Sequence, residues 1–127
     1  MPSRATRASS LLVLLFAVFC AGPALADYTD TVVLKNGDRI TGDVNSLAQG
    51  RLSFDTDAMG TVSIEWDKVA EILSEKSMQV ETTGGIRYFG QLERSARDAE
   101  VTVKTTESVE TVAIADVVHI TPIGQSF

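Results

Sequence analysis

The chain has 127 residues, of which 11 are basic and 17 are acidic, and its formal net charge at pH 7 is −6. Nucleic-acid binding depends on neutralising phosphates, so this acidic balance argues against a nucleic-acid partner and against direct binding to anionic lipid. One cysteine, Cys20, excludes a disulfide framework within the chain.

Residues 1–26 have the pattern of a secretory signal peptide. Arg4 and Arg7 precede an apolar run at 11–21, and small residues at 24 and 26 form a small-x-small pattern that predicts cleavage after Ala26. The run is shorter than the about 20 residues that a membrane-spanning helix needs, so the mature chain is expected to contain no transmembrane segment. Cleavage would leave nine basic and seventeen acidic residues, a net charge of −8, and no cysteine. We therefore predict an exported domain held together by core packing alone.

The rest of the chain contains a short all-β pattern twice, at an offset of 48 residues. Residues 32–44 align with 80–92, and Ile64 and Trp66 align with Val112 and Ile114. A one-residue loop insertion makes the offset 49 for the strand between these blocks. We predict a first unit at 27–75 and a second unit at 76–127. A lone core rarely suffices below about 40 residues, so units of this size are expected to share a core or a tight interface.

Alternating apolar and polar residues predict the strands of the first unit, after a polar lead-in at 27–30. These strands are expected at 31–35, 39–44, 51–56 and 62–66. Asn36-Gly37 predicts a hairpin turn, and residues 47–50 predict a loop. Within the second strand, Gly42 permits a bend or the close approach of a neighbouring backbone. Core positions then recur every three residues, which predicts one turn of 3₁₀ helix before a last short strand (Trp66, Val69, Ile72).

The second unit repeats this order of strands and turns. Residues 73–83 contain no proline or glycine, so they are expected to run nearly straight from one unit into the next. Five short strands and one 3₁₀ turn per unit predict a small, strongly bent SH3-like or Sm-like barrel. We predict an all-β protein of two such barrels packed in tandem. A single β-sandwich of all ten strands is the alternative.

Four segments of the first unit, with their turn glycines and core positions, resemble a known family: LKNGDRITG (34–42), GRLSF (50–54), GTVSIEWD (60–67) and VAEI (69–72). They are similar to the soluble N-terminal region of the bacterial salt-induced outer-membrane protein family, whose function is uncharacterised. The resemblance extends over residues 30–123. In that family a transmembrane β-barrel follows this region, where the present sequence stops at Phe127. The resemblance implies a cell-envelope location, in the periplasm of a Gram-negative bacterium or associated with its outer membrane, and supplies no catalytic residue.

Few side chains are candidates for a functional site. His119 is the only histidine and has no cysteine partner in the mature chain, so a Cys/His pair is excluded and zinc would need carboxylate ligands. We expect neither a metal nor a cofactor. Arg39 and Arg87, at equivalent positions, can each bind an anion through the planar guanidinium group or pair with a nearby carboxylate. Trp66 shares the phase of Ile64, so it is expected in the core.

Two hypotheses for function remain. We favour a non-enzymatic envelope module that binds a protein or wall component through exposed strand edges or loops. The alternative is a hydrolase or metal-dependent enzyme whose site lies between the two units and uses His119 with acidic residues. Buried carboxylates near His119 between the units would favour the enzyme, and an apolar seam would favour the module.

Overall fold

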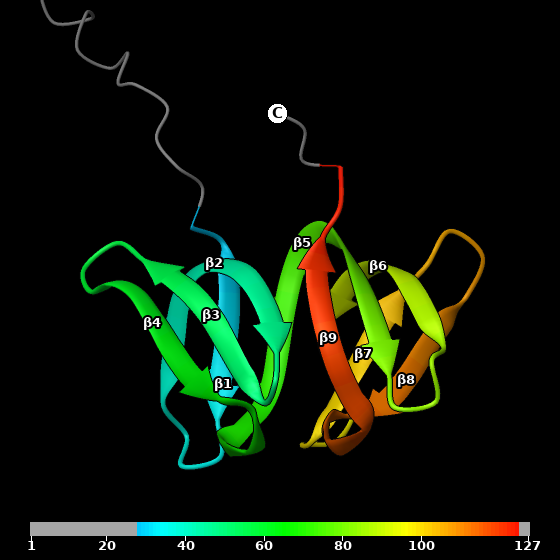
Figure 1. The fold of residues 1–127 in the computed structure, drawn as a ribbon, viewed down its shortest axis with the longest axis horizontal. Coiled ribbons are helices and arrows are strands. Elements are labelled where there is room, and N and C mark those ends of the chain that lie inside the picture. Colours follow the sequence, from blue (N-terminus) through cyan, green and yellow to red (C-terminus); the bar gives the residue numbers. More distant parts are fainter. Residues whose placement is uncertain (1–27, 125–127) are drawn as a thin grey trace, which may run out of the picture.

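The computed structural model describes residues 28–124, so the predicted signal peptide lies outside the described range. This part of the chain is all-β (Figure 1). Its strands are β1 (Asp30–Leu34), β2 (Arg39–Ala48), β3 (Arg51–Thr56), β4 (Gly60–Glu65), β5 (Val69–Thr82), β6 (Arg87–Glu93), β7 (Glu100–Lys104), β8 (Val109–Ala113) and β9 (Val117–Pro122). The single-turn 3₁₀ segments η2 (Trp66–Lys68) and η3 (Ile114–Asp116) precede β5 and β9.

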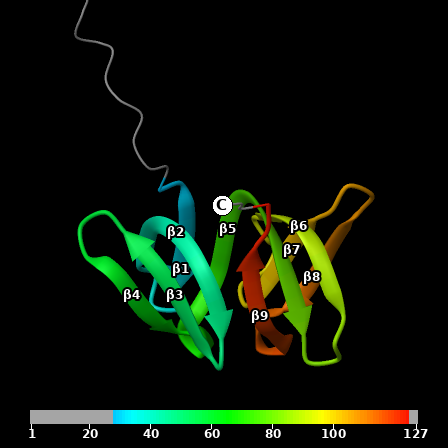
Figure 2. The same cartoon turned by 45° about the horizontal axis from the view of Figure 1, so that its top comes forward.

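The strands form one antiparallel sheet in the order β4-β3-β2-β1-β5-β6-β7-β8, with β9 off this path. Because β9 pairs with β5 and, through Ile120 and Leu47, with β2, strands β1, β2, β5 and β9 close into a small barrel. The other strands extend from it. Figures 1 and 2 both show two strongly curved halves with β5 between them. No helix within residues 28–124 has the length and hydropathy of a membrane span.

β5 joins the two halves as one strand of 14 residues. Its first part pairs with β1 and its last part with β6 and β9. The sequence predicted a nearly straight run here. The structure confirms one continuous strand, but β5 bends over between the halves (Figure 1), and its pairing with β6 shifts register between Ser74 and Met78. The expected last strand of the first unit and first strand of the second unit are therefore one element, so residues 28–124 contain nine strands in place of the expected ten. Residues 28–75 are called the first half and residues 76–124 the second half.

The pairing registers of the two halves correspond residue by residue. Val32 lies opposite Ile72 between β1 and β5, and Val80 lies opposite Ile120 between β5 and β9. A register shift comes at the same place in each pair, after Val33 and after Glu81. Two residues are called equivalent when they occupy corresponding places in these registers.

Buried apolar side chains from both halves form one cluster. Leu52 and Phe54 of β3 and Val101 and Val103 of β7 have no exposed surface. They are the inward-facing residues that the alternating pattern predicts, and Trp66 is buried with them, as predicted. The halves therefore share a core, as expected from their small size.

Gly42 lies where two backbones approach closely. A Cβ atom built there would overlap the carbonyl oxygen of Asp55, and one built at Gly90 would overlap that of Lys104. The close approach that the sequence allowed for Gly42 is confirmed. It lets β2 and β6 bend tightly over the strands that follow them.

The predicted loop at 47–50 is wrong in its extent. β2 continues to Ala48, and only Gln49 and Gly50 turn, with φ angles of 52° and 76°. Leu47 is 1% exposed and pairs with both Leu52 and Ile120. Packing against the second half thus extends the strand, and a pattern confined to the first unit contains no sign of that contact.

Candidate functional site

His119 lies on β9 with half of its side chain exposed. Its Nδ1 atom is 3.7 Å from Oε1 of Glu81, and Nε of Arg87 is also 3.7 Å from that oxygen. Both contacts are cross-strand, because Glu81 of β5 lies opposite Arg87 on one side and His119 on the other. These three residues form a surface cluster in which the Glu81 carboxylate lies close to both Arg87 and His119.

The buried part of the seam between the halves is apolar, and a pocket of about 690 Å³ beside it also has polar lining residues, among them Arg51, Glu65 and Asp67. Trp66 is 5% and Ile114 is 4% exposed, and the indole Nε1 of Trp66 donates a 2.8 Å hydrogen bond to the carbonyl oxygen of Ile114. Nearby, Leu47 lies opposite Ile120, and both are buried. His119 is outside this seam and faces solvent.

The structure places the two candidate anion contacts, Arg39 and Arg87, in different halves and does not bring them together. Arg87 is paired with Glu81, so it has the nearby carboxylate partner that the sequence left open for it. Arg39 is exposed on β2 opposite Val33, and it forms no ion pair among the described residues.

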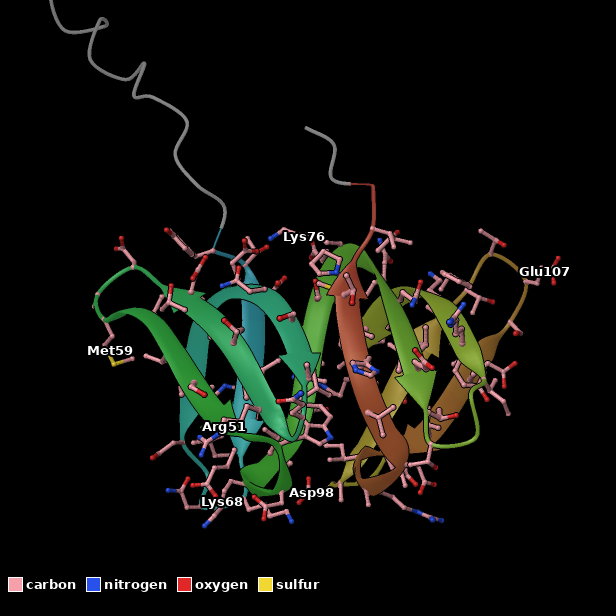
Figure 3. All side chains as sticks on the ribbon, viewed as in Figure 1. Arg51, Met59, Lys68, Lys76, Asp98 and Glu107 are labelled. Atoms are coloured by element: carbon pink, nitrogen blue, oxygen red, sulfur yellow. The ribbon has the colours of Figure 1, made fainter. Side chains whose placement is uncertain are left out.

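A pocket of about 710 Å³ lies beside β4 in the first half. Its lining includes three cationic side chains, those of Lys35, Arg51 and Lys68, with one carboxylate, Glu65. Figure 3 shows Arg51 and Lys68 at the same end of the first half. We call this the cationic pocket. The sequence does not reveal this pocket, because its cations come from a turn, a strand and a 3₁₀ segment that are separated in the chain.

The cations of this pocket have no ion-pair partners among the described residues, although Glu65 lies opposite Arg51 in the sheet. Every lysine or arginine that does form an ion pair there belongs to the second half (Lys76, Arg87, Arg94, Lys104). Yet residues 27–75 contain ten of the seventeen acidic residues and only four basic ones, three of which line the pocket. Scarcity of carboxylates therefore does not explain why the cations of the first half form no ion pairs among the described residues.

At the three equivalent positions the second half has two carboxylates and no cation. The amide nitrogen of Lys35 donates to the backbone carbonyl oxygen of Lys68 at 2.9 Å. In the second half the amide nitrogen of Thr83 donates to the backbone carbonyl oxygen of Asp116 at 2.8 Å. Arg51 lies opposite Glu65, and its equivalent Glu100 lies opposite Ala113. Lysine, arginine and lysine in the first half thus correspond to threonine, glutamate and aspartate in the second.

The cationic pocket adjoins a free strand edge. β4 is a terminal strand of the sheet and pairs only with β3 within residues 28–124. Ser63, Ile64 and Glu65 of β4 line the pocket. At the other end of the sheet, β8 pairs only with β7 in the described range. Such edges present unpaired N–H and C=O groups that another strand can bind.

Asp30 was predicted to lie in a polar lead-in, and the structure corrects this. It is the first residue of β1 and has no exposed surface. Its carboxylate accepts hydrogen bonds from the Val44 amide at 2.9 Å and the Ser74 hydroxyl at 2.7 Å. The ammonium group of Lys76 lies 3.8 Å from Asp30 and also pairs with Asp43. The offset of 48 could have revealed the burial, because the equivalent residue, Met78, is an apolar core residue.

A smaller polar network surrounds Asp55 on β3. The Thr61 hydroxyl and the Asn45 side-chain amide both donate to its Oδ1 atom. These hydrogen bonds, that of Thr61 first, lower the pKa of Asp55 below its ordinary value of 3.8. The carboxylate is therefore held in its charged form on the outer side of the sheet.

Among residues 28–124, no three His, Cys, Asp or Glu side chains are grouped closely enough to hold a metal ion. Comparisons of the chain with family models, with curated proteins and with solved structures find no match. The arrangement of charges and strand edges is therefore what bears on function.

Proposed function

We propose that this protein is an exported, non-enzymatic module of the cell envelope that binds a protein or wall component. The observation that carries the proposal is the cationic pocket. This pocket gathers three cations beside a free strand edge on an acidic chain, and these cations form no ion pairs among the described residues. Such a surface is suited to bind an anionic partner.

The buried part of the seam supports the non-enzymatic part of the proposal. An enzyme that used His119 between the units would need that side chain there, whereas the buried contacts are Trp66 beside Ile114 and Leu47 beside Ile120. His119 is half exposed and contacts one carboxylate that Arg87 also contacts.

The proposal includes a finer description of the fold, as two small SH3-like or Sm-like barrels from a duplicated unit at 27–75 and 76–127. The matching registers of the halves support it. So does the contact between Trp66 and Ile114, because residues at equivalent positions meet at the axis of a two-fold arrangement.

The leader pattern and the resemblance to the salt-induced outer-membrane protein family support the envelope location. Fractionation of cells that express the full chain, with N-terminal sequencing, tests it. We expect a periplasmic or outer-membrane-associated product that begins at Asp27. A full-length product in the cytoplasm would contradict the proposal.

Site-specific photocrosslinking in the envelope tests the binding function. A photoreactive amino acid is placed at Ser63 beside the pocket and, as a matched control, at Thr111, the equivalent position on β8. We expect Ser63 to capture a discrete partner, Thr111 to capture none, and Arg51→Glu to abolish the capture. Capture from both positions, or from Ser63 regardless of Arg51, would contradict a binding role for the pocket.

A further inference from the structure

We propose that the cationic pocket and the free edge of β4 together bind an extended acidic polypeptide segment, which adds to β4 as a further strand. This inference rests on the proposed binding function and specifies the class of its partner. Three features of the site support it: the strand edge, the charges and the apolar lining of the pocket.

The strand edge favours a polypeptide over a small anion. Ser63, Ile64 and Glu65 line the pocket and belong to a strand that pairs on one side only in the described chain. A peptide laid along this edge can make main-chain hydrogen bonds to β4 while its side chains enter the pocket. A free phosphate or carboxylate can use the cations but gains nothing from the edge.

The charges select acidic side chains. Lys35 follows β1, Arg51 begins β3 and Lys68 ends η2, so cations from three segments surround the space beside β4. Since Glu65 is the one carboxylate that the described residues contribute to the lining, the pocket has an excess of positive charge. Arginine binds carboxylates through two parallel hydrogen bonds, which gives the site directional specificity as well as charge.

The two sides of the sheet at this edge differ in character. Arg51 and its cross-strand neighbour Glu65 are exposed, whereas Leu52 and its neighbour Ile64 are buried. An added strand in which acidic and aliphatic residues alternate would place its acids on the side of Arg51 and its aliphatic groups on the side of Ile64. Leu34, also in the pocket lining, adds apolar surface. The partner segment is therefore expected to alternate acidic and aliphatic residues.

The second half provides the matched control. Thr83, Glu100 and Asp116 occupy the positions equivalent to the three cations, and β8 is a free edge like β4 within the described chain. If a free edge were sufficient, the peptide would bind to both β4 and β8. If the cations are also required, the peptide should bind to β4 only.

The test uses an acetylated and amidated peptide of alternating glutamate and valine, labelled for fluorescence anisotropy, with protein purified after expression of the full chain. We expect saturable, salt-sensitive binding of one peptide per chain. Bound peptide should slow amide hydrogen exchange in β4 and leave β8 unchanged. A peptide with lysine in place of glutamate should not bind.

Variants exchange residues between the halves, so that each new side chain is one the fold already holds at the equivalent place. Lys35→Thr, Arg51→Glu and Lys68→Asp together should weaken peptide binding by at least about tenfold. Thr83→Lys, Glu100→Arg and Asp116→Lys together should create a second site and raise the stoichiometry to two. Trp66 fluorescence reports whether each variant folds. If the first variant does not fold, the amide hydrogen exchange of the wild type with bound peptide and the binding stoichiometry of the second variant test the inference.

The inference would be overturned by no peptide binding, by equal binding of the lysine peptide, or by protection of β8 as much as of β4. Full competition by equimolar inorganic phosphate would indicate a small-anion site and would overturn it as well. Sedimentation that showed self-association dependent on Arg51 would identify a second copy as the occupant and would also overturn it. A partner captured from Ser63 that contains no acidic segment would leave the binding function standing while this inference fails.

Discussion

The indole nitrogen of Trp66 donates its hydrogen bond to the carbonyl oxygen of Ile114, the residue that lies 48 positions later in the chain. Trp66 begins η2 and Ile114 begins η3, so two equivalent segments touch at their first residues. The bond is buried, and both side chains belong to the common core. It therefore links the two halves through a buried donor and a buried acceptor.

Trp66→Phe is expected to lower the free energy of unfolding by about 1–3 kcal/mol, because it removes the donor to a buried carbonyl and part of the ring volume. Urea unfolding followed by far-ultraviolet circular dichroism measures this, since Trp66 is the only tryptophan. The wild type should unfold in one transition because its halves share a core. Two separate transitions, or an unchanged stability in the variant, would contradict this view of the seam.

Much of the fold can be predicted from local patterns in the sequence. Alternation identifies Leu52 and Phe54 as inward-facing because each strand buries one side, and Asn36-Gly37 marks a turn that the structure contains. What local patterns miss are consequences of contact between the halves. Leu47 continues β2 because it pairs with Ile120, which lies far along the chain.

Gly42→Ala is expected to destabilise the protein by about 1–3 kcal/mol or more, because the added Cβ overlaps the Asp55 carbonyl oxygen and the backbones must separate. Gly84→Ala is the control, since a Cβ there meets nothing within 4 Å and its φ is not in the left-handed region. That change should be neutral or stabilise by up to about 1 kcal/mol. Similar losses in both variants, measured by chemical denaturation, would argue against the close approach.

The candidate site could be predicted less well than the fold. Charge counting indicates an acidic chain but not that Lys35, Arg51 and Lys68 converge, since the folded sheet alone brings the three segments together. Arg39 and Arg87 were predicted as anion contacts because the repeat aligns them, yet they lie on different strands in different halves. A comparison of charge between equivalent positions would have marked Arg51 and Glu100 as different.

Asp30→Ala is expected to cost about 2–4 kcal/mol, because the Val44 amide and the Ser74 hydroxyl lose their buried acceptor. Asp43→Ala, which removes the more exposed partner of Lys76, should cost about 1 kcal/mol or less. Denaturant unfolding of both variants checks the order. An equal or larger loss for Asp43 would show that Lys76, and not the two buried donors, determines the stability of this cluster.

The Asp55 network predicts a pH dependence of known sign. The folded pKa of Asp55 lies below 3.8, so the unfolded chain binds its proton first as the pH falls, and the stability from this group is present above that value and is lost below it. Thr61→Val, which installs the residue found at the equivalent Val109, should therefore reduce stability at neutral pH and approach the wild type in acid. Ser63→Ala on the same strand should show no such trend. A pH-independent difference for Thr61→Val would contradict the hydrogen-bond origin of the shift.

His119→Ala is expected to leave both crosslinking from Ser63 and any cellular phenotype unchanged, because the imidazole is half exposed and the carboxylate with which it pairs also pairs with Arg87. The free energy of unfolding should change by no more than about 0.5 kcal/mol, as for other surface pairs. Arg51→Glu is the comparison, since it should abolish crosslinking while the protein remains folded. Complementation of a deletion strain and thermal unfolding of both variants provide the readouts. Loss of the phenotype in a folded His119→Ala protein that still crosslinks from Ser63 would count against the module, because binding at the cationic pocket would then not account for the phenotype.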